Sequence, residues 1–165
     1  MGAGFHGGFG KTRGYNVAVA GDAVFESGEK LYFSYIARRK DVDANGKYDV
    51  VAHGSKKSIL VQHNNKNVEI NSREAAKLIK NRDDYKKGKP IRLLSCNTGK
   101  LNNGFAQNLA NKLGVTVYAP TDVIWAKNNG EHFIAPYKKG SREPDNKIRG
   151  KFRKFVPGGN KKWKN

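Results

Sequence analysis

Apolar positions alternate with polar ones, or run together, in several short stretches that predict β-strands. These stretches are residues 15–21, 30–38, 48–52, 91–95 and 115–120. Short continuous apolar runs such as residues 48–52 are typical of strands buried on both faces. Residues 58–70 predict a hairpin whose arms join at Asn64 and Asn65. We therefore expect a central sheet with at least one accessory hairpin.

Two further stretches have the apolar spacing of amphipathic helices. In residues 71–81 we expect Asn71 to be the N-cap and Glu74 to complete a capping box. Residues 102–114 have a similar pattern, and Gly114 is expected to end that helix.

The order strand, helix, strand, helix, strand along the middle of the chain predicts an α/β fold. Helical crossovers of this kind connect parallel strands, so we expect a mostly parallel central sheet. In such sheets the working groups gather beyond the carboxyl ends of the strands. His53 and Cys96 each stand at such an end, with one helical crossover between them. We expect their side chains to lie within contact distance.

Length and composition favour one domain in a chain of 165 residues. We interpret residues 1–14 as a glycine-rich linker, residues 15–157 as the folded domain and residues 158–165 as a basic tail. A single cysteine excludes an internal disulfide and a Cys-rich zinc site. No apolar stretch is long enough to predict a membrane span.

The formal net charge of +18 is unevenly placed along the chain. Residues 138–165 hold eleven Lys or Arg against two acidic residues, a net of +9. Such a field attracts nucleic acid, an anionic membrane surface, a phosphorylated small molecule or an acidic protein. The alternative is a solvated basic tail that only keeps the domain soluble.

The candidate chemistry is that of a thiol with a base. A cysteine is nucleophilic as its thiolate, and an imidazole is suited to take the proton. His53 is placed to do so for Cys96, and the N–H groups of Gly54 and Cys96 are candidates for an oxyanion hole. The alternative is that Cys96 is a buried core residue and that His53 only caps a strand.

Three further residues near the candidate site are also candidates or have competing interpretations. Asp122 and Ser95 are candidates for a substrate pocket, in which Asp122 would recognise a basic side chain; equally, Asp122 caps a turn or balances a nearby lysine. Trp125 is interpreted as a core residue rather than a binding surface.

The aromatic and histidine residues elsewhere give weaker indications. Phe152 and Phe155 alternate with Arg153 and Lys154, which suits either a nucleic-acid strand or an edge strand with one apolar face. Trp163 is expected to lie in an exposed tail. The other histidines, His6, His63 and His132, are isolated, so we predict no metal site.

Two motifs, "DVVAHGS" and "IRLLSCNTG", resemble the His-Gly and Cys strand ends of the caspase-like cysteine peptidases. They are most similar to the autoprocessing cysteine protease domains of large bacterial toxins, the multifunctional autoprocessing repeat toxins and the large clostridial glucosylating toxins. The similarity covers residues 46–135 and includes "SREAAKLIKN" between the motifs. The caspase signature Gln-Ala-Cys, with a glycine two residues on, is absent around Cys96, so the chain is no caspase proper.

The resemblance implies a caspase-like fold with a late β-hairpin region and a Cys-His peptidase. Cys96 would be the nucleophile, His53 the general base or proton shuttle, and Gly54 and Cys96 the oxyanion hole. The chemistry would need no cofactor, but inositol hexakisphosphate or another polyanion is an expected activator. Candidate polyanion-binding residues in the basic, hairpin-like region are Lys138, Lys139, Arg149, Lys151, Arg153 and Lys154.

The glycine-rich start and basic end also resemble the C-terminal modules of bacterial polymorphic toxins. That resemblance implies contact-dependent inhibition: delivery into a rival cell, action in its cytoplasm on a protein substrate or on the parent chain, and neutralisation by an acidic immunity protein. One competing hypothesis is a nuclease toxin acting on tRNA or DNA, with His53 or His132 as acid or base and nucleic acid held by the basic C-terminal region. Another is a non-catalytic nucleic-acid or membrane-surface binder.

Overall fold

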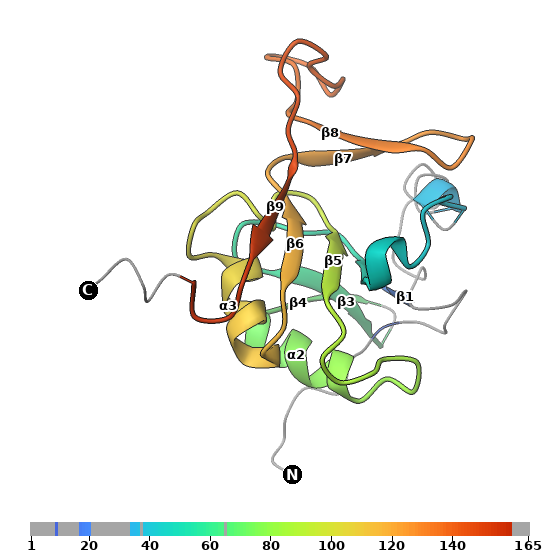
Figure 1. Cartoon of the computed structure of the whole chain (residues 1–165). Helices are drawn as coiled ribbons and strands as arrows, with labels where there is room; N and C mark the ends of the chain where they lie inside the picture. Colours follow the sequence, from blue (N-terminus) through green and yellow to red (C-terminus); the bar gives the residue numbers. More distant parts are fainter. Residues whose placement is uncertain (1–8, 10–16, 21–33, 37, 65, 160–165) are drawn as a thin grey trace.

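A five-stranded, mostly parallel sheet forms the centre of the protein (Figure 1). The structure is a computed structural model, and it describes residues 9, 17–20, 34–36, 38–64 and 66–159. The sheet has the order β1-β2-β5-β6-β9, in which the first four strands are parallel and β9 is antiparallel to β6. The named elements are β1 (Val17–Val19), the 3-10 turn η1 (Ala44–Gly46), β2 (Tyr48–Val51), β3 (Ile59–His63), β4 (Lys66–Ile70), α2 (Ser72–Lys80), β5 (Ile91–Leu94), α3 (Phe105–Leu113), β6 (Val117–Pro120), β7 (Val123–Ala126), β8 (His132–Ala135) and β9 (Phe152–Phe155).

The two central strands, β2 and β5, are buried along their whole length. Their apolar runs are what a strand covered on both faces requires. The register pairs Tyr48 with Ile91 and Val51 with Leu94. The predicted mixed α/β fold with a mostly parallel sheet is thereby confirmed.

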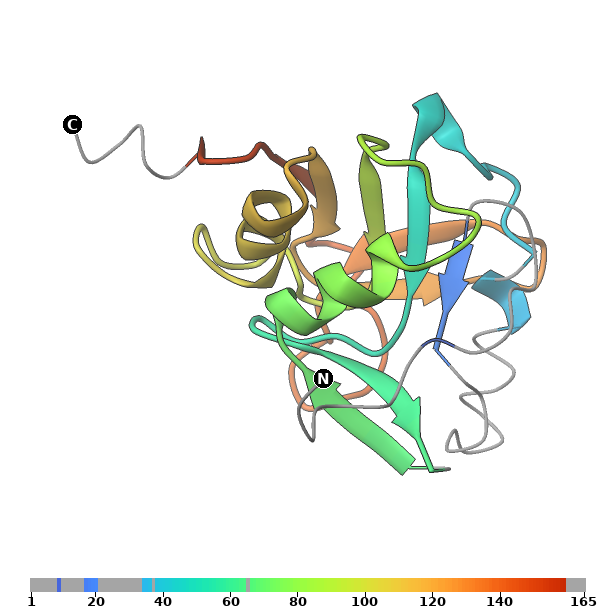
Figure 2. The same ribbon diagram turned by 90° about the horizontal axis from the view of Figure 1, so that it is seen from below.

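Helices α2 and α3 cover one face of the sheet and pack against each other (Figure 2). The Asn71 side chain accepts a hydrogen bond from the Glu74 amide and the Glu74 carboxylate accepts one from the Asn71 amide, so the predicted capping box is present. Gly114 ends α3 in the left-handed conformation, with φ +70°. The hydroxyl of Ser72 donates to the carbonyl of Phe105 at 3.0 Å and ties the two helices together.

Hairpin β7–β8 extends beyond the carboxyl ends of β5 and β6 (Figure 1). Ile124 and Ile134 on its inner side are buried against Val51 and Leu94 of the sheet. Val17 and Ile36 belong to the same group, which is called the second apolar cluster below. The first and larger cluster includes the buried apolar side chains of helices α2 and α3. The carboxyl ends of the central strands therefore lie between helix α3 and this hairpin.

Two details differ from the predicted elements. Residues 34–36, part of a predicted strand, form a helical turn, and the amides of Arg38 and Arg39 donate to the carbonyls of Tyr35 and Ile36. Of those three residues only Ile36 is buried, so the apolar residues do not share one face of a strand.

The late β-hairpin region, expected in residues 131–159, does not form a single hairpin. β8 pairs with β7, whereas β9 joins the edge of the central sheet. The proposed linker, residues 1–14, lies outside the described residues except for Phe9, which bridges Ala20. Residues 160–165 of the proposed tail also lie outside them.

Candidate active site

The His53-Gly54 and Cys96 segments lie directly against each other at the carboxyl ends of β2 and β5. The β2–β5 register ends with the pair Val51 and Leu94, and His53 and Cys96 each follow two residues later. Neighbouring strands are about 4.8 Å apart. A Cβ atom at Gly54 would lie only 2.8 Å from the carbonyl oxygen of Cys96, so only glycine fits there without displacing the cysteine segment.

The start of helix α3 is hydrogen-bonded to the loop that follows His53 and to the loop that follows Cys96. The amide of Phe105 donates to the carbonyl of Lys56 at 2.9 Å, just after His53. The amide of Ala106 donates to the carbonyl of Thr98 at 3.2 Å, just after Cys96. One helix terminus therefore fixes the two loops that carry the predicted dyad.

The thiol of Cys96 is partly exposed and faces hairpin β7–β8. The amide of Ile124 donates to its Sγ at 3.4 Å. Burial raises the pKa of Cys96, and the amides of Ile124 and of Cys96 itself lower it by less. The thiol is therefore protonated at neutral pH in this conformation, and it needs a base to react as a thiolate.

The loop after Cys96 is held by the strand that follows α3. Asn97 adopts the left-handed conformation with φ +63°, which asparagine tolerates. Its amide donates to the carbonyl of Asp122 at 3.0 Å, and the Gly99 amide donates to that of Pro120 at 2.8 Å. A Cβ at Gly99 would lie 2.4 Å from the carbonyl oxygen of Ala119, so this close approach also requires glycine.

Of the two candidate pocket residues, Asp122 is engaged in polar contacts, and Ser95 is buried with a hydroxyl that has no hydrogen-bond partner among the described residues. The Asp122 carboxylate lies 3.2 Å from the Lys100 ammonium and accepts a hydrogen bond from the Thr121 hydroxyl at 2.8 Å. This arrangement fits the interpretation in which Asp122 balances a nearby lysine. Ser95 is 1% exposed. That placement gives no support to Ser95 as a pocket residue in this conformation.

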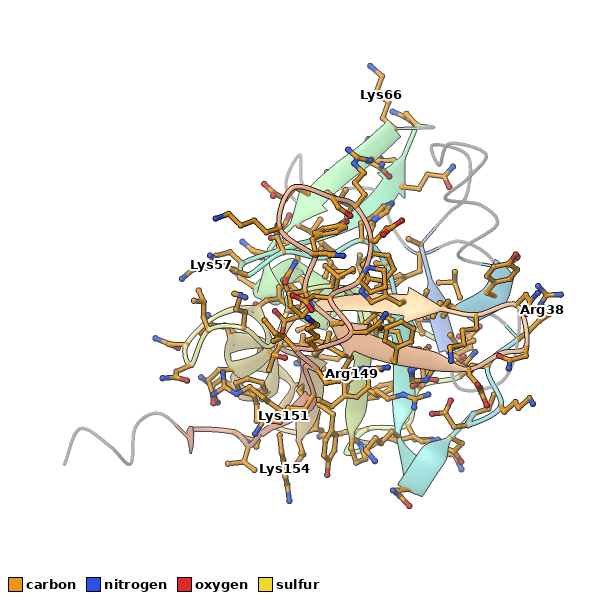
Figure 3. The ribbon with its side chains drawn as sticks, turned by 90° about the horizontal axis from the view of Figure 1, so that it is seen from above. Arg38, Lys57, Lys66, Arg149, Lys151 and Lys154 are labelled. Carbon is orange, nitrogen blue, oxygen red and sulfur yellow. The ribbon has the colours of Figure 1, made fainter. Side chains whose placement is uncertain are left out.

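The basic candidates are divided between solvent and the cysteine loop. Lys138, Lys139, Arg149, Lys151 and Lys154 are exposed, and Figure 3 shows the last three succeeding one another from hairpin β7–β8 along β9. Arg153 differs from them. Its guanidinium donates to the carbonyls of Gly99 and Lys100 and to the Asn102 side chain, at 3.0, 3.3 and 2.7 Å, and so holds the cysteine loop.

Strand β9 is an edge strand, as one of its two interpretations expects, and not an open binding surface for nucleic acid. It is the edge strand of the central sheet, and Phe155 is buried at 4% exposure. Phe152 packs against the second apolar cluster. The guanidinium of Arg153 lies over the Phe155 ring, 4.9 Å from its centre. Phe152 and Phe155 are three residues apart in the strand and pack into different apolar clusters, so β9 is an edge strand with one phenylalanine on each face rather than a strand with one apolar face.

A buried ionic cluster lies on the same two strands and was not predicted. The Asp49 carboxylate accepts hydrogen bonds from Arg39 and from Arg92, at 2.7 and 2.8 Å from the latter. Arg92 also reaches Asp41, which lies 3.3 Å from Nε2 of His132. Asp49 and Arg92 each stand second in a continuous apolar run, and that signal could have indicated a buried, paired charge.

The structure describes two of the remaining aromatic and histidine candidates, Trp125 and His63. Trp125 is half-buried and lies outside both buried apolar clusters, so it is not the core residue that the sequence predicts; its indole N–H donates to the carbonyl of Ala135 at 2.9 Å. His63 ends β3. His6 and Trp163 lie outside the described residues. Among the residues that the structure describes, no three His, Cys, Asp or Glu side chains are grouped so as to hold a metal ion.

The described part of the chain also contains no helix with the length and apolarity needed to cross a membrane.

Comparison with known proteins gives one match. The model of a family described as a domain of unknown function, DUF8616, matches residues 22–134, which include His53 and Cys96. No curated protein and no solved structure matches the chain. The matched region covers most of the central sheet, both helices and hairpin β7–β8. The chain therefore belongs to the DUF8616 family.

Proposed function

We propose that this protein is a caspase-like cysteine peptidase that acts as a bacterial toxin module. The observation that carries the proposal is the contact of Gly54 with Cys96, which brings the residue after His53 against the cysteine at two adjacent strand ends. Polar groups at the carboxyl ends of parallel strands are where α/β folds place their chemistry.

In the proposed reaction His53 takes the proton from the Cys96 thiol, and the sulfur attacks the carbonyl carbon of a peptide bond. The N–H groups of Gly54 and Cys96 donate to the resulting oxyanion. His53 then gives the proton to the leaving amine, and a thioester remains on Cys96. Water hydrolyses the thioester, which releases the carboxylate and restores the thiol.

Activation by a polyanion is part of the proposal. The raised pKa of Cys96, caused by partial burial, supports a resting state of low reactivity. Arg153 holds the cysteine loop from the same strand that carries the exposed Lys154. Inositol hexakisphosphate or another polyanion bound to this basic region would act on the loop through β9. An acidic immunity protein, delivery into a target cell and action in its cytoplasm complete the proposed setting.

The nuclease hypothesis has less support from the site. His132 lies 3.3 Å from the Asp41 carboxylate within the buried ionic cluster and is 11% exposed. A general acid or base for phosphodiester cleavage needs access to the substrate.

Digestion of a peptide library tests the proposal. A library derived from a bacterial proteome is incubated with the wild-type protein, with and without inositol hexakisphosphate, and new termini are identified by mass spectrometry. We expect cleavages that are lost in Cys96→Ala and kept in the matched control His63→Ala. Cleavages that persist in Cys96→Ala, or no cleavage in any condition, would overturn the assignment.

A further inference from the structure

The outer side of hairpin β7–β8 presents a cluster of aromatic rings. The register pairs Ile124 with Ile134 on the inner side and Trp125 with Phe133 on the outer side. The Trp125 and Phe133 rings are stacked, with centroids 6.4 Å apart and planes 17° apart. Tyr137 meets Trp125 edge-on, with centroids 5.6 Å apart.

Two cations lie over the Phe133 ring of this cluster. The Arg149 guanidinium is 4.5 Å from the centre of the Phe133 ring, and the Lys127 ammonium is 5.5 Å from it. Trp125, Lys127, Phe133, Tyr137 and Arg149 together are called the outer hairpin face below. Figure 3 shows Arg149 beside the hairpin and Arg38 at its tip, where Arg38 lies 5.2 Å from the centre of the Tyr35 ring.

The outer hairpin face is accessible and positively charged. Tyr137 is 54% exposed. Residues 123–150 contain six Lys or Arg against three acidic residues. Glu131 lies 3.8 Å from Lys127, with both side chains more than half exposed, and Glu143 and Asp145 flank Pro144, which bridges Tyr137.

We propose that the outer hairpin face binds single-stranded nucleic acid. An exposed ring, that of Tyr137, and two half-buried rings next to cations match the two parts of a single strand, because bases stack on rings while Lys and Arg neutralise phosphates. A duplex hides the faces of its bases, so the rings favour a single strand. This binding function is independent of the peptidase, and it is separate from β9, whose phenylalanines are covered.

Fluorescence anisotropy with two labelled oligomers tests the proposal. One probe is a 20-nucleotide thymidine strand, and the other is an abasic strand of equal length and charge. We expect the wild-type protein to bind the thymidine strand more tightly at the same salt concentration. Tyr137→Ala should weaken binding of the thymidine strand by about tenfold and leave the abasic strand unaffected, because one stacked base is lost.

Arg149→Ala should weaken binding of both probes, because it removes a phosphate contact. Lys66→Ala is the matched control, since Lys66 lies at the tip of hairpin β3–β4, away from the outer hairpin face (Figure 3). In a Trp163→Phe background, the thymidine strand should also quench the fluorescence of Trp125. Equal affinity for the two probes, no effect of Tyr137→Ala, or binding only to phosphatidylserine vesicles would overturn the proposal.

Discussion

Strands β2 and β5 carry two sets of polar residues with opposite surroundings. Asp49 pairs with Arg92 inside the sheet, whereas His53 and Cys96 follow the ends of the two strands. Asp49 is fully buried and accepts hydrogen bonds from two guanidinium groups. Cys96 stands past the strand end, partly exposed, and its sulfur accepts one weak hydrogen bond from a neighbouring amide.

The comparison shows that a polar residue inside this strand pair, such as Asp49, has a structural role, whereas a polar residue just past the strand end, such as Cys96, is placed for chemistry. A charge inside the sheet must be paired, because an isolated buried ion is very costly. Cys96 lies past the strand end and is partly exposed, so its thiol is open to a substrate in a way that Asp49 is not. Four substitutions or conditions would break or sharpen this contrast.

The largest expected effect is on activity. His53→Ala should lower the rate of peptide cleavage by about 10²–10⁴-fold, because general base catalysis is lost. The midpoint of thermal unfolding should stay close to that of the wild type, since His53 lies at the edge of the core. Initial rates on a peptide found in the library digestion, together with circular dichroism melts, measure both. Unchanged cleavage in this variant would remove His53 from the site.

Asp49→Ala should have the largest effect on stability. It leaves the guanidinium groups of Arg39 and Arg92 buried without their shared carboxylate. We expect a loss of about 3–5 kcal/mol in the free energy of unfolding. Urea denaturation measures it, and Glu69→Ala on the exposed side of β4 serves as a control. A loss no larger than that of the control would mean that the cluster is not a structural requirement.

Gly54→Ala should damage both properties at once. The added Cβ would meet the Cys96 carbonyl, the Thr98 methyl group and the Ser95 Cβ within 2.9 Å. Overpacking of this kind costs about 1–3 kcal/mol and moves the cysteine segment. We expect weaker peptide cleavage and a lower unfolding midpoint, whereas Gly140→Ala, where a Cβ has open space, should change the cleavage rate little. Wild-type cleavage by Gly54→Ala would contradict the tight contact.

The smallest effect concerns acid stability. Burial raises the pKa of Asp41, but hydrogen bonds and charge from Arg92, with a further contribution from His132, lower it to about 2 from an ordinary value of 3.8. Its stabilising contribution is therefore complete above pH 3.8 and is lost as the pH falls toward 2. Urea unfolding of the wild type and Asp41→Asn should give midpoints that differ at pH 5 and converge near pH 2. A constant difference across this range would exclude the linkage.

Much of the fold was predictable because local signals and tertiary structure agree. The Asn71–Glu74 capping box and the Gly114 stop are local features that the structure contains. The strand ends at His53 and Cys96 follow from the parallel connection of strands through a helix.

Other features depend on contacts between segments far apart in the chain. At residues 34–36 a helical turn forms where a strand is predicted, and of these three residues only Ile36 is buried. The ionic cluster joins residues from β2, β5, β8 and the segment before η1, so no single stretch predicts it. The role of Arg153 in holding the cysteine loop likewise appears only when β9 lies beside that loop.

The coupling of His53 to Cys96 is tested most directly by the rate of thiol alkylation. Intact-mass spectrometry would follow the reaction of the folded protein with iodoacetamide between pH 6 and pH 10, for the wild type, His53→Ala and the control His63→Ala. Because Cys96 is the only cysteine, each added mass reports on that thiol. We predict that His53→Ala slows the reaction at pH 7 several-fold and that His63→Ala does not. Equal rates for all three proteins at every pH would contradict a His53–Cys96 dyad.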